Sequence, residues 1–360
     1  MDVAIFGAGI AGLMTAITMR AQGHHCRIYE RHRKSHEAGM GFILVHAAIE
    51  CLENYGVHLT GAFGGACLHK YNCRDHKGKL LEQKDIPPGT RAIRRRDLMA
   101  ALVHSLSSDS PLTFDAELER LEIDSCGSIT AARLSSGVRI QADLYVGADG
   151  ICSRARRALF PDWPAPKDRV PEVVGLVRCR ETVQWAGHNF NKFHHPDGGL
   201  AFGVLPVDDD HLVWFVQADA LRFPPPEENA GACEAFVKKL LRNWADPIPH
   251  LLSTTDFSRV HLWHALDMDL IPSFHKGKLV LVGDAAHPLL PFTSQGVSSA
   301  VADAVALAHL TGVSRNLGTA LAHYSLQRRE QCAPYVSRGR ELMQNFLAPL
   351  DGKGIVLPIA

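Results

Sequence analysis

The first thirty residues carry the feature that most constrains the fold of this chain. A short apolar run, Met1 to Phe6, ends in a glycine-rich turn, after which small and apolar residues recur at helical spacing. A strand, a tight turn and a helix in this order are typical of a dinucleotide-binding unit, because the glycines let a pyrophosphate approach the backbone and the helix start attracts its charge. The candidate cofactor-binding residues of this turn are Gly7, Gly9, Ile10, Ala11 and Gly12.

An acidic residue stands where such a unit needs one. A strand predicted over His25 to Tyr29 ends at Glu30, which Arg31 follows. A carboxylate at this place hydrogen-bonds the ribose hydroxyls of the adenosine. We therefore include Glu30 and Arg31 in the cofactor site, which would suit FAD or NAD. The alternative is a glycine-rich turn that binds nothing.

Two later segments favour FAD over NAD. Apolar runs predict strands over residues 142–146 and 278–282, and they lead into Gly147-Ala148-Asp149-Gly150 and Gly283-Asp284. Taken singly, these could be a surface turn and a helix cap. In this order and spacing, the three segments resemble those of the single-component FAD-dependent aromatic hydroxylases, the p-hydroxybenzoate hydroxylase-like flavoprotein monooxygenases, over nearly the whole chain.

The resemblance implies a role for each segment. Asp149 and Gly150 match a motif used for FAD and NAD(P)H, and Asp284 would accept a hydrogen bond from the ribityl chain of the flavin. Arg95 stands where the family has an arginine that neutralises the FAD pyrophosphate, although a solvated basic helix start is the alternative. Further candidate cofactor-binding residues by resemblance are Gly41, Gly283, Pro291, Gln295, Gly296, Val297 and Ser298.

Two places depart from the family pattern. Ser294 and Ser298 stand where relatives often have Gly and Asn, at the start of a helix whose N–H groups would favour negative charge on the flavin. His46 lies where the glycine-rich segment Gly39 to Ala47 usually ends in Pro-Asn. His46 is therefore the candidate catalytic acid or base, with a histidine at a helix cap as the alternative.

The remainder of the chain predicts a second domain. Runs over 200–205 and 211–216 form an antiparallel hairpin, with another strand over 173–180. By resemblance this sheet covers the substrate, so Phe292 and one face of the hairpin would line the pocket, whereas ordinary sheet core is the alternative for the hairpin residues. The candidate lining residues of the hairpin are Phe202, Val204, Trp214 and Val216.

The predicted fold class is α/β, with a Rossmann-like FAD-binding domain interleaved with a mixed or antiparallel β-sheet substrate domain, plus C-terminal helices. The FAD-binding domain comprises 1–70, 95–165 and 270–320, the substrate domain 71–94 and 166–269, and the C-terminal helical segment 321–360.

Composition excludes several classes of protein. Lys plus Arg and Asp plus Glu number 38 each, which gives no electrostatic footprint for nucleic acid. The nine cysteines include no CxxC pair, which suits reduced thiols in the cytoplasm. The spacing of the 20 histidines predicts no metal site, and no apolar run predicts an integral membrane segment. A monomer and a homodimer are both compatible with the sequence.

The resemblance implies the reaction. NADPH or NADH would reduce FAD, O2 would add at the flavin C4a carbon, and the hydroperoxide would pass one oxygen to a small apolar or aromatic, electron-rich substrate by hydroxylation or epoxidation. A flavoprotein dehydrogenase or oxidase on the same fold is the main alternative, and a non-catalytic flavin- or ligand-binding protein is another. A flavin-dependent halogenase is disfavoured because its Trp-x-Trp-x-Ile-Pro signature is missing.

Overall fold

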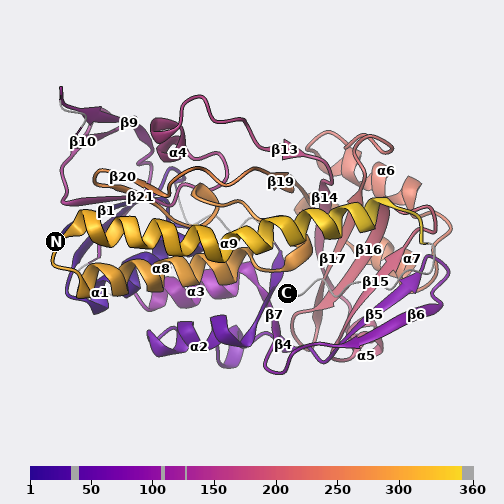
Figure 1. Cartoon of the computed structure of the whole chain (residues 1–360). Coiled ribbons are helices and arrows are strands. Elements are labelled where there is room, and N and C mark those ends of the chain that lie inside the picture. Colours follow the sequence, from indigo (N-terminus) through magenta and orange to yellow (C-terminus); the bar gives the residue numbers. More distant parts are fainter. Residues whose placement is uncertain (34–39, 107–109, 126–127, 351–360) are drawn as a thin grey trace.

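Two β-sheets lie side by side in the computed structural model, and one long helix, α9 (Leu317–Leu347), runs along both of them (Figure 1). The structure describes residues 1–33, 40–106, 110–125 and 128–350. Near its start, α9 is tied to the first sheet by a hydrogen bond from Tyr324 Oη to the Leu281 carbonyl at 2.9 Å. At its end, the Phe346 carbonyl accepts the N–H of Gly199, in the turn between two strands of the second sheet, at 2.7 Å.

The first sheet has six strands in the order β20-β21-β12-β1-β2-β8, and all neighbours are parallel except β20 and β21. Its central strands are buried on both faces, as expected where helices cover both sides of a parallel sheet. The strands predicted over 1–6, 25–29, 142–146 and 278–282 are confirmed as members of this sheet. Its strands are β1 (Asp2–Phe6), β2 (His25–Tyr29), β8 (Leu112–Thr113), β12 (Leu144–Gly147), β20 (His275–Lys276) and β21 (Leu279–Leu281).

The helices beside this sheet pack closely because small residues lie between them. Thr18 Oγ1 on α1 donates to the Ala304 carbonyl on α8 at 3.0 Å. By length and composition α8 could cross a membrane, but here it packs against α1, α2 and α9 as a core helix. The helices of this half are α1 (Ile10–Ala21), α2 (His46–Asn54), α3 (Arg95–His104), α4 (Arg154–Leu159) and α8 (Gly296–Val313).

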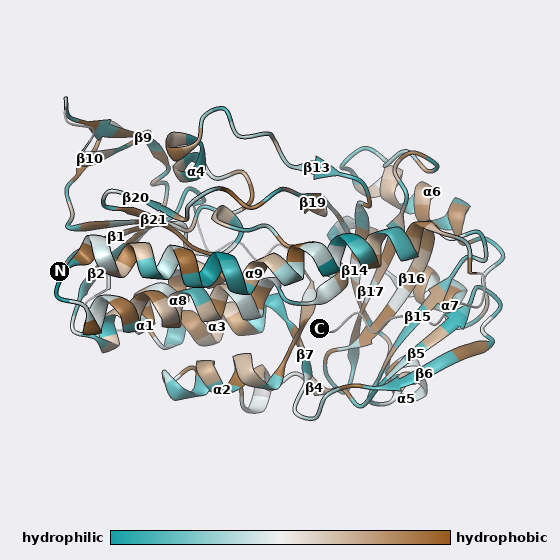
Figure 2. Cartoon of the chain, viewed as in Figure 1, coloured by the Kyte–Doolittle hydropathy of each residue, from teal (hydrophilic) through white to brown (hydrophobic). Residues whose placement is uncertain are grey.

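The second sheet has seven strands in the order β18-β14-β17-β16-β15-β5-β6, antiparallel except between β15 and β5. The predicted hairpin is confirmed as β16 and β17. The edge strand β6 and its neighbour β5 are largely hydrophilic (Figure 2). The strands are β5 (Lys70–Asp75), β6 (Leu80–Asp85), β14 (Glu172–Arg178), β15 (Asn189–His194), β16 (Leu200–Pro206), β17 (His211–Ala218) and β18 (His261–Trp263), and the nearby helices are α5 (Arg180–Ala186), α6 (Ala230–Leu240) and α7 (Ile248–Thr254).

Smaller elements connect the two sheets. Three short sheets are formed by β3 (Gly41–Leu44), β7 (Arg91–Arg94) and β4 (Ala66–Cys67), by β11 (Arg139–Ile140), β10 (Ile129–Leu134) and β9 (Leu118–Ile123), and by β13 (Lys167–Asp168) and β19 (Leu266–Asp267). The 3-10 turns are η1 (Gly61–Phe63), η2 (Phe257–Arg259), η3 (Gly283–Ala285) and η4 (Pro291–Thr293). Because β7 pairs with β3 and β4, it joins the two predicted domains.

The predicted lining residues of β16 and β17 lie on the wrong face of the sheet. Phe202, Val204, Trp214 and Val216 are fully buried in the core beneath α6 and α7. Trp214 covers Gly175, where a Cβ would lie 2.4 Å from the indole, and its Nε1 donates to Thr255 Oγ1 at 2.9 Å. Successive side chains of β17 point to opposite faces of the sheet, and both faces are apolar. The sequence therefore does not indicate which face of β17 meets the pocket.

The predicted fold class is confirmed: a Rossmann-like half, a mixed β-sheet half and a C-terminal helix. The boundaries of the two predicted domains we keep as a proposal. The end of the C-terminal segment, residues 351–360, lies outside the described residues, as does Gly39.

Candidate functional site

Three chain segments meet at the carboxyl edge of the first sheet. Gly7 has a positive φ of 111°, and a Cβ there would lie 2.2 Å from the Ala148 carbonyl oxygen, so only glycine lets the first two segments touch. Gly12 is held as tightly, because its Cβ would lie 1.9 Å from the Gly7 oxygen. At Gly9, by contrast, a Cβ would meet nothing within 4 Å. The turn therefore packs on one side and is open on the other.

Two adjoining cavities lie at this open side. One has a volume of about 470 Å³ and is walled by β1, β2 and the start of α4; we name it the dinucleotide compartment. The other, of about 370 Å³, reaches the second sheet, and we name it the sheet compartment. Both are lined by Gly9, Arg95, Ala148, Gly150, Ile151, Trp263 and Asp284.

Most predicted cofactor residues line these compartments. The dinucleotide compartment includes Gly7, Gly9, Glu30, Arg31, Arg95, Asp149, Gly150 and Asp284. The sheet compartment includes Gly9, Ile10, Ala11, Gly41, Arg95, Gly150, Asp284, Pro291, Gly296 and Val297, together with Phe292. Gly12, Gly283, Gln295 and Ser298 line neither compartment.

Glu30 is held rigidly at the end of β2. Its Oε2 accepts the N–H of Ala8 at 2.7 Å, and its Oε1 accepts the N–H of His32 at 3.0 Å and faces His32 Nδ1 at 2.7 Å. Burial disfavours its charged form, but these hydrogen bonds outweigh burial and keep the pKa of Glu30 below its ordinary value. The side chain therefore presents a fixed carboxylate to the dinucleotide compartment.

Arg95 is the arginine of its cluster that faces the pocket. Arg94 pairs with Asp97 at 2.5 Å and with Asp208 at 3.1 Å, and Arg96 pairs with Asp97 at 3.3 Å. Arg95 Nε is buried without a hydrogen-bond partner among the described residues. Burial lowers the pKa of Arg95, and the nearby Asp284 carboxylate opposes this effect. A partly buried guanidinium with an open, buried donor is suited to an anionic ligand.

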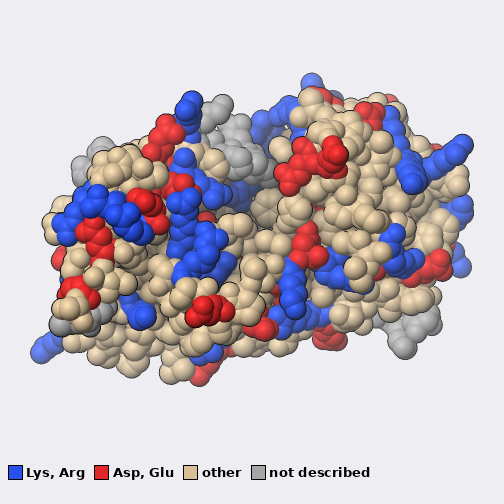
Figure 3. All heavy atoms as spheres, turned by 90° about the horizontal axis from the view of Figure 1, so that it is seen from above, with Lys and Arg blue, Asp and Glu red and all other residues tan. Residues whose placement is uncertain are grey.

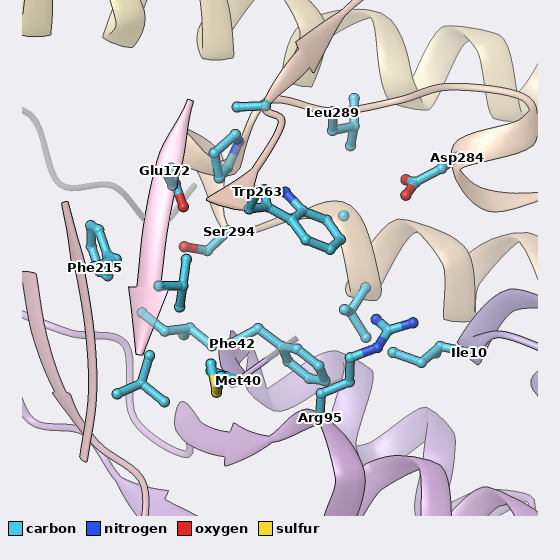
Figure 4. Close-up of a pocket in the computed structure, with 18 of the residues that line it drawn as sticks. Ile10, Met40, Phe42, Arg95, Glu172, Phe215, Trp263, Asp284, Leu289 and Ser294 are labelled. Atoms are coloured by element: carbon cyan, nitrogen blue, oxygen red, sulfur yellow. The ribbon is translucent and has the colours of Figure 1, made fainter. Parts of the chain in front are cut away.

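Asp284 projects into the pocket at the same end as Arg95 (Figure 4). Its side chain is open to the pocket space, while desolvation by the surrounding protein raises its pKa against the opposing charges of His287, Arg95 and Arg156. Its backbone is fixed from outside the pocket, because Arg156 Nη1 donates to the carbonyls of Asp284 and Ala285 at 3.0 Å each. Arg156 thereby links the second sequence segment to the third.

The carboxylate of Asp149 is hydrogen-bonded to residues at the start of α4. Its carboxylate accepts hydrogen bonds from Ser153 Oγ at 2.5 Å and from the N–H groups of Arg154 and Ala155 at 2.6 and 3.0 Å. These are the first N–H groups of α4, so Asp149 holds the helix start against the dinucleotide compartment.

The start of α8 forms one wall of the sheet compartment. Ser294 has a positive φ of 56° and lines the cavity with Gly296 and Val297, and a Cβ at Gly296 would meet nothing within 4 Å. Ser298 Oγ is buried without a hydrogen-bond partner among the described residues. The helix thus presents backbone N–H groups and a positive dipole end to the cavity.

The far end of the sheet compartment carries a polar chain that the sequence did not predict. Lys192 Nζ donates to Gln217 Oε1 at 2.5 Å, and Gln217 Nε2 donates to Glu172 Oε1 at 2.6 Å. Desolvation raises the pKa of Glu172 and lowers that of Lys192 to about 8. The remaining walls are mainly apolar: Met40, Phe42, Val174, Phe190, Leu205, Val213, Phe215 and Trp263.

The structure does not bring His46, the candidate catalytic acid or base, to the pocket. His46 is the first residue of α2, its side chain is 58% exposed, and it lines neither compartment. Its Nε2 lies 3.3 Å from Glu50 Oε1, one helical turn later. The helix-cap alternative is close but not exact, because Val45 is the N-cap of α2 and His46 is the first residue inside the helix, with no capping hydrogen bond from a side chain.

Metal-ligating residue types meet in one buried cluster behind the pocket. His287, Asp303 and Cys332 place their ligand atoms within 4.8 Å of one another. The carboxylate of Asp303 is already engaged, since it lies 2.6 Å from both His287 Nε2 and Arg328 Nε. Burial disfavours the charged form of His287, but Asp303 raises its pKa well above the ordinary value. We interpret the cluster as a buried ion-pair network.

Known proteins share this architecture. A family described as FAD binding domain matches residues 1–335. The aurachin C monooxygenase/isomerase of Stigmatella aurantiaca is 28% identical over 348 residues, which cover 94% of this chain and 87% of that protein. The 3-amino-4-hydroxybenzoate 2-monooxygenase PtnB3 of Streptomyces platensis is 28% identical over 384 residues, covering 97% and 89%. The structure of Klebsiella pneumoniae HpxO, complexed with FAD and uric acid, has a TM-score of 0.83 at 22% identity, covering 95% and 87%.

In this protein, Arg95 and Asp284 line both the dinucleotide compartment and the sheet compartment. Together with the matched family and the named relatives, this fold and site define a class, the FAD-dependent monooxygenases. The chain belongs to the FAD-binding domain family of these flavoenzymes, which confirms the family and the enzyme class predicted from the three sequence segments.

Proposed function

We propose that the protein is an NAD(P)H-using, FAD-dependent monooxygenase that inserts one oxygen atom of O2 into a small aromatic substrate by hydroxylation or epoxidation. In balance, substrate, O2, NAD(P)H and a proton give oxygenated substrate, NAD(P)+ and water. The observation that carries the proposal is the junction of the two compartments at Arg95 and Asp284, because it leaves room for a dinucleotide on one side and a substrate on the other.

The residues at the junction fit FAD. Gly9, Gly150 and Gly296 all face open space where a Cβ would stand, so their backbones can approach a ligand closely. The buried Arg95 Nε without a partner suits a pyrophosphate oxygen, and the Asp284 carboxylate suits a ribityl hydroxyl. Glu30 would meet the adenosine ribose, with Arg31 beside it, and Gly41, Asp149, Pro291 and Val297 would line the remaining contact surface.

Bound FAD supplies the chemistry of accepting hydride from NAD(P)H and reducing O2. The protein contributes position, charge and exclusion of water. The N–H groups at Gly296 and Val297 and the helix end would stabilise negative charge on the ring. Gln295 and Ser298, which line neither compartment, would act by holding this helix start.

The sheet compartment is the proposed substrate site. Phe42 and Trp263 lie across its width from each other, and Phe215 lies at another side (Figure 4). Phe292 also lines this compartment. Such aromatic walls suit a flat, apolar ring and keep water out. The sequence relatives include an enzyme named for an aminohydroxybenzoate, which supports an aromatic substrate. The requirement for NAD(P)H favours a cytoplasmic setting.

Isotope labelling tests this proposal. The flavin-loaded protein is reduced anaerobically with NADPH or NADH in the presence of a panel of small aromatics, and the fastest combination is then supplied with labelled O2. We expect aromatic-stimulated reduction and one labelled oxygen atom in the product. Substrate oxidation with no label would favour the dehydrogenase or oxidase alternative, and a flavin that NAD(P)H never reduces would contradict the proposal.

A further inference from the structure

The Lys192 ammonium is a buried cation in the wall of the sheet compartment. It lies on β15, an interior strand of the second sheet, and the residue is 5% exposed. Three aromatic rings surround it, with Nζ at 5.8, 5.5 and 5.6 Å from the ring centres of Phe215, Phe292 and Phe346. Removing an ammonium from water is costly, and cation–π contacts of about 0.5–2 kcal/mol each recover only part of that cost.

Among the residues that the structure describes, no carboxylate forms an ion pair with the Lys192 ammonium. An ammonium has three N–H donors, and the described residues give Lys192 one acceptor, the neutral oxygen of Gln217. The nearest carboxylate, Glu172, is bonded to the other end of the same amide, so Gln217 separates the two charges. Burial lowers the pKa of Lys192 to about 8, and the Glu172 carboxylate opposes this effect by favouring the charged form.

The pairing of β15, β16 and β17 places the Lys192 ammonium beside the cavity. Lys192 on β15 and Phe215 on β17 both pair in register with Gly203, which lies on β16 between them. A Cβ at Gly203 would lie 2.2 Å from the Phe215 ring, so only glycine leaves room for this ring, whose centre is 5.8 Å from Lys192 Nζ. The opposite end of the compartment holds Arg95 and Asp284, as seen from Glu172 and Phe215 in Figure 4.

We propose that Lys192 anchors an anionic oxygen of the substrate, so that the site selects aromatic compounds that carry a carboxylate or an ionised hydroxyl group. This inference rests on the proposed function, because it takes the sheet compartment as the substrate site. The oxygen accepts an N–H of Lys192, the ring lies among Phe215, Phe42 and Phe292, and the position to be oxygenated points toward the Arg95 end. Lys192 binds and orients the substrate, and Gln217 positions Lys192.

Matched charged and neutral probes test the anchor. Purified flavoprotein is titrated with benzoate against benzamide, and with pentafluorophenolate against pentafluoroaniline, while the shift of the flavin absorption bands reports binding. The first pair tests a carboxylate and the second an ionised hydroxyl. The variants Lys192→Met and Lys192→Gln remove the charge, Lys192→Arg keeps it, and Lys239→Met removes an exposed lysine on α6.

We expect the wild type to bind at least one anion about tenfold or more tightly than its neutral partner, as a charged hydrogen bond predicts. That preference should fall to about twofold or less in Lys192→Met or Lys192→Gln and should persist in Lys192→Arg and Lys239→Met. Binding of the neutral probes should not change in any variant, which a merely structural role of Lys192 would not predict.

Two results would overturn the inference: a wild type that shows no preference for either anion, or a preference that survives loss of the lysine charge. If neither charge-removing variant folds, the wild-type preference decides alone. The proposed function is judged separately from the same preparation, without probes, by flavin retention and by reduction with NAD(P)H.

Discussion

The backbone N–H of Gly283 donates to the carboxylate of Asp303 on α8 at a distance of 2.7 Å. Asp303 is fully buried, and Gly283 precedes Asp284, which faces the pocket. Since the same carboxylate also bonds His287 and Arg328, helix α8, helix α9 and the turn at Asp284 are joined through one side chain. The position of the pocket carboxylate therefore depends on a network that lies outside the pocket.

Replacing Asp303 by Asn should destabilise the protein strongly. The change leaves Arg328 buried without its counter-ion, and breaking a buried pair costs about 3–5 kcal/mol. The matched control is Asp267→Asn, which removes a half-exposed ion pair to Arg340 and should cost about 1 kcal/mol or less. Urea unfolding measures both variants, and equal losses would contradict the central role of Asp303.

Two glycines of the first turn should separate folding from cofactor binding. Gly12→Ala should prevent stable folding, since its Cβ would lie 1.9 Å from the Gly7 oxygen. Gly9→Ala should fold normally, because its Cβ would point into open space, yet it should weaken FAD binding by about tenfold or more by crowding the pyrophosphate. Circular dichroism measures folding and flavin titration measures FAD affinity in both variants. An unchanged FAD affinity in Gly9→Ala would contradict binding of the pyrophosphate at this turn.

Neighbouring arginines provide a matched test of the pocket cation. Arg95→Met should weaken FAD retention by about tenfold to a hundredfold, because it removes a buried charged donor. Arg96→Met should leave retention unchanged, since Arg96 is half exposed and pairs with Asp97. Asp284→Asn should also lower retention without unfolding the protein. Retention after desalting is the measurement, and wild-type values in both Arg95→Met and Asp284→Asn would refute the site.

The two faces of β17 should respond differently to truncation. Trp214→Ala should lower the free energy of unfolding by about 3–5 kcal/mol, because its indole fills the core over Gly175. Phe215→Ala should instead raise the KM for an aromatic substrate, since its ring lines the sheet compartment. Unfolding curves and steady-state kinetics on both variants check this, and the assignment of faces fails if the two effects are exchanged.

His264, which lines the sheet compartment, should make the stability of the protein depend on pH. Its Nδ1 lies 2.5 Å from Asp168 and its Nε2 3.0 Å from Glu228. Burial disfavours the charged ring, but the two carboxylates outweigh burial and raise the pKa of His264. Because the pKa is raised on folding, the stabilisation is complete below about pH 6.5 and is lost as pH rises through the raised value.

The half-exposed ring keeps this effect small, within about 1 kcal/mol or about 2 °C in Tm. The wild type should therefore melt above His264→Gln at about pH 5.5, and the gap should close by about pH 8.5. A gap that widens with pH would reverse the sign and contradict the ion pairs.

The sequence predicted the Rossmann half well because its signals are local. The strand at His25–Tyr29 and the turn at Gly7 follow from apolar runs and glycines that act within a few residues. Arg95 could be chosen from its cluster only by resemblance, and its burial without a partner at Nε is a property of the folded chain.

The substrate side was less predictable because its residues come from separate strands. Trp214 and Phe215 differ by one position, and only the packing of α6 and α7 decides which of them faces the pocket. Lys192 and Glu172 are connected only in the folded chain, where a third residue, Gln217, forms hydrogen bonds to both of them across the sheet. The segment around Lys192 is mainly polar, with Phe190 and Phe193 as its apolar residues, so the sequence gives no sign that Lys192 is buried beside a pocket.

The surface charge does not point to a ligand different from the one proposed for the pocket. On the face seen in Figure 3, basic and acidic side chains are interspersed over the two halves, in keeping with their equal numbers in the chain. The charges that define a ligand are instead the few that line the cavities.

Binding of FAD is tested most directly by the visible spectrum of the purified protein after incubation with FAD and desalting. We expect oxidised-flavin bands at about one flavin per chain, and their loss in Arg95→Met but not in Arg96→Met. A wild-type protein that emerges without flavin absorption would contradict the proposed site and, with it, the monooxygenase function.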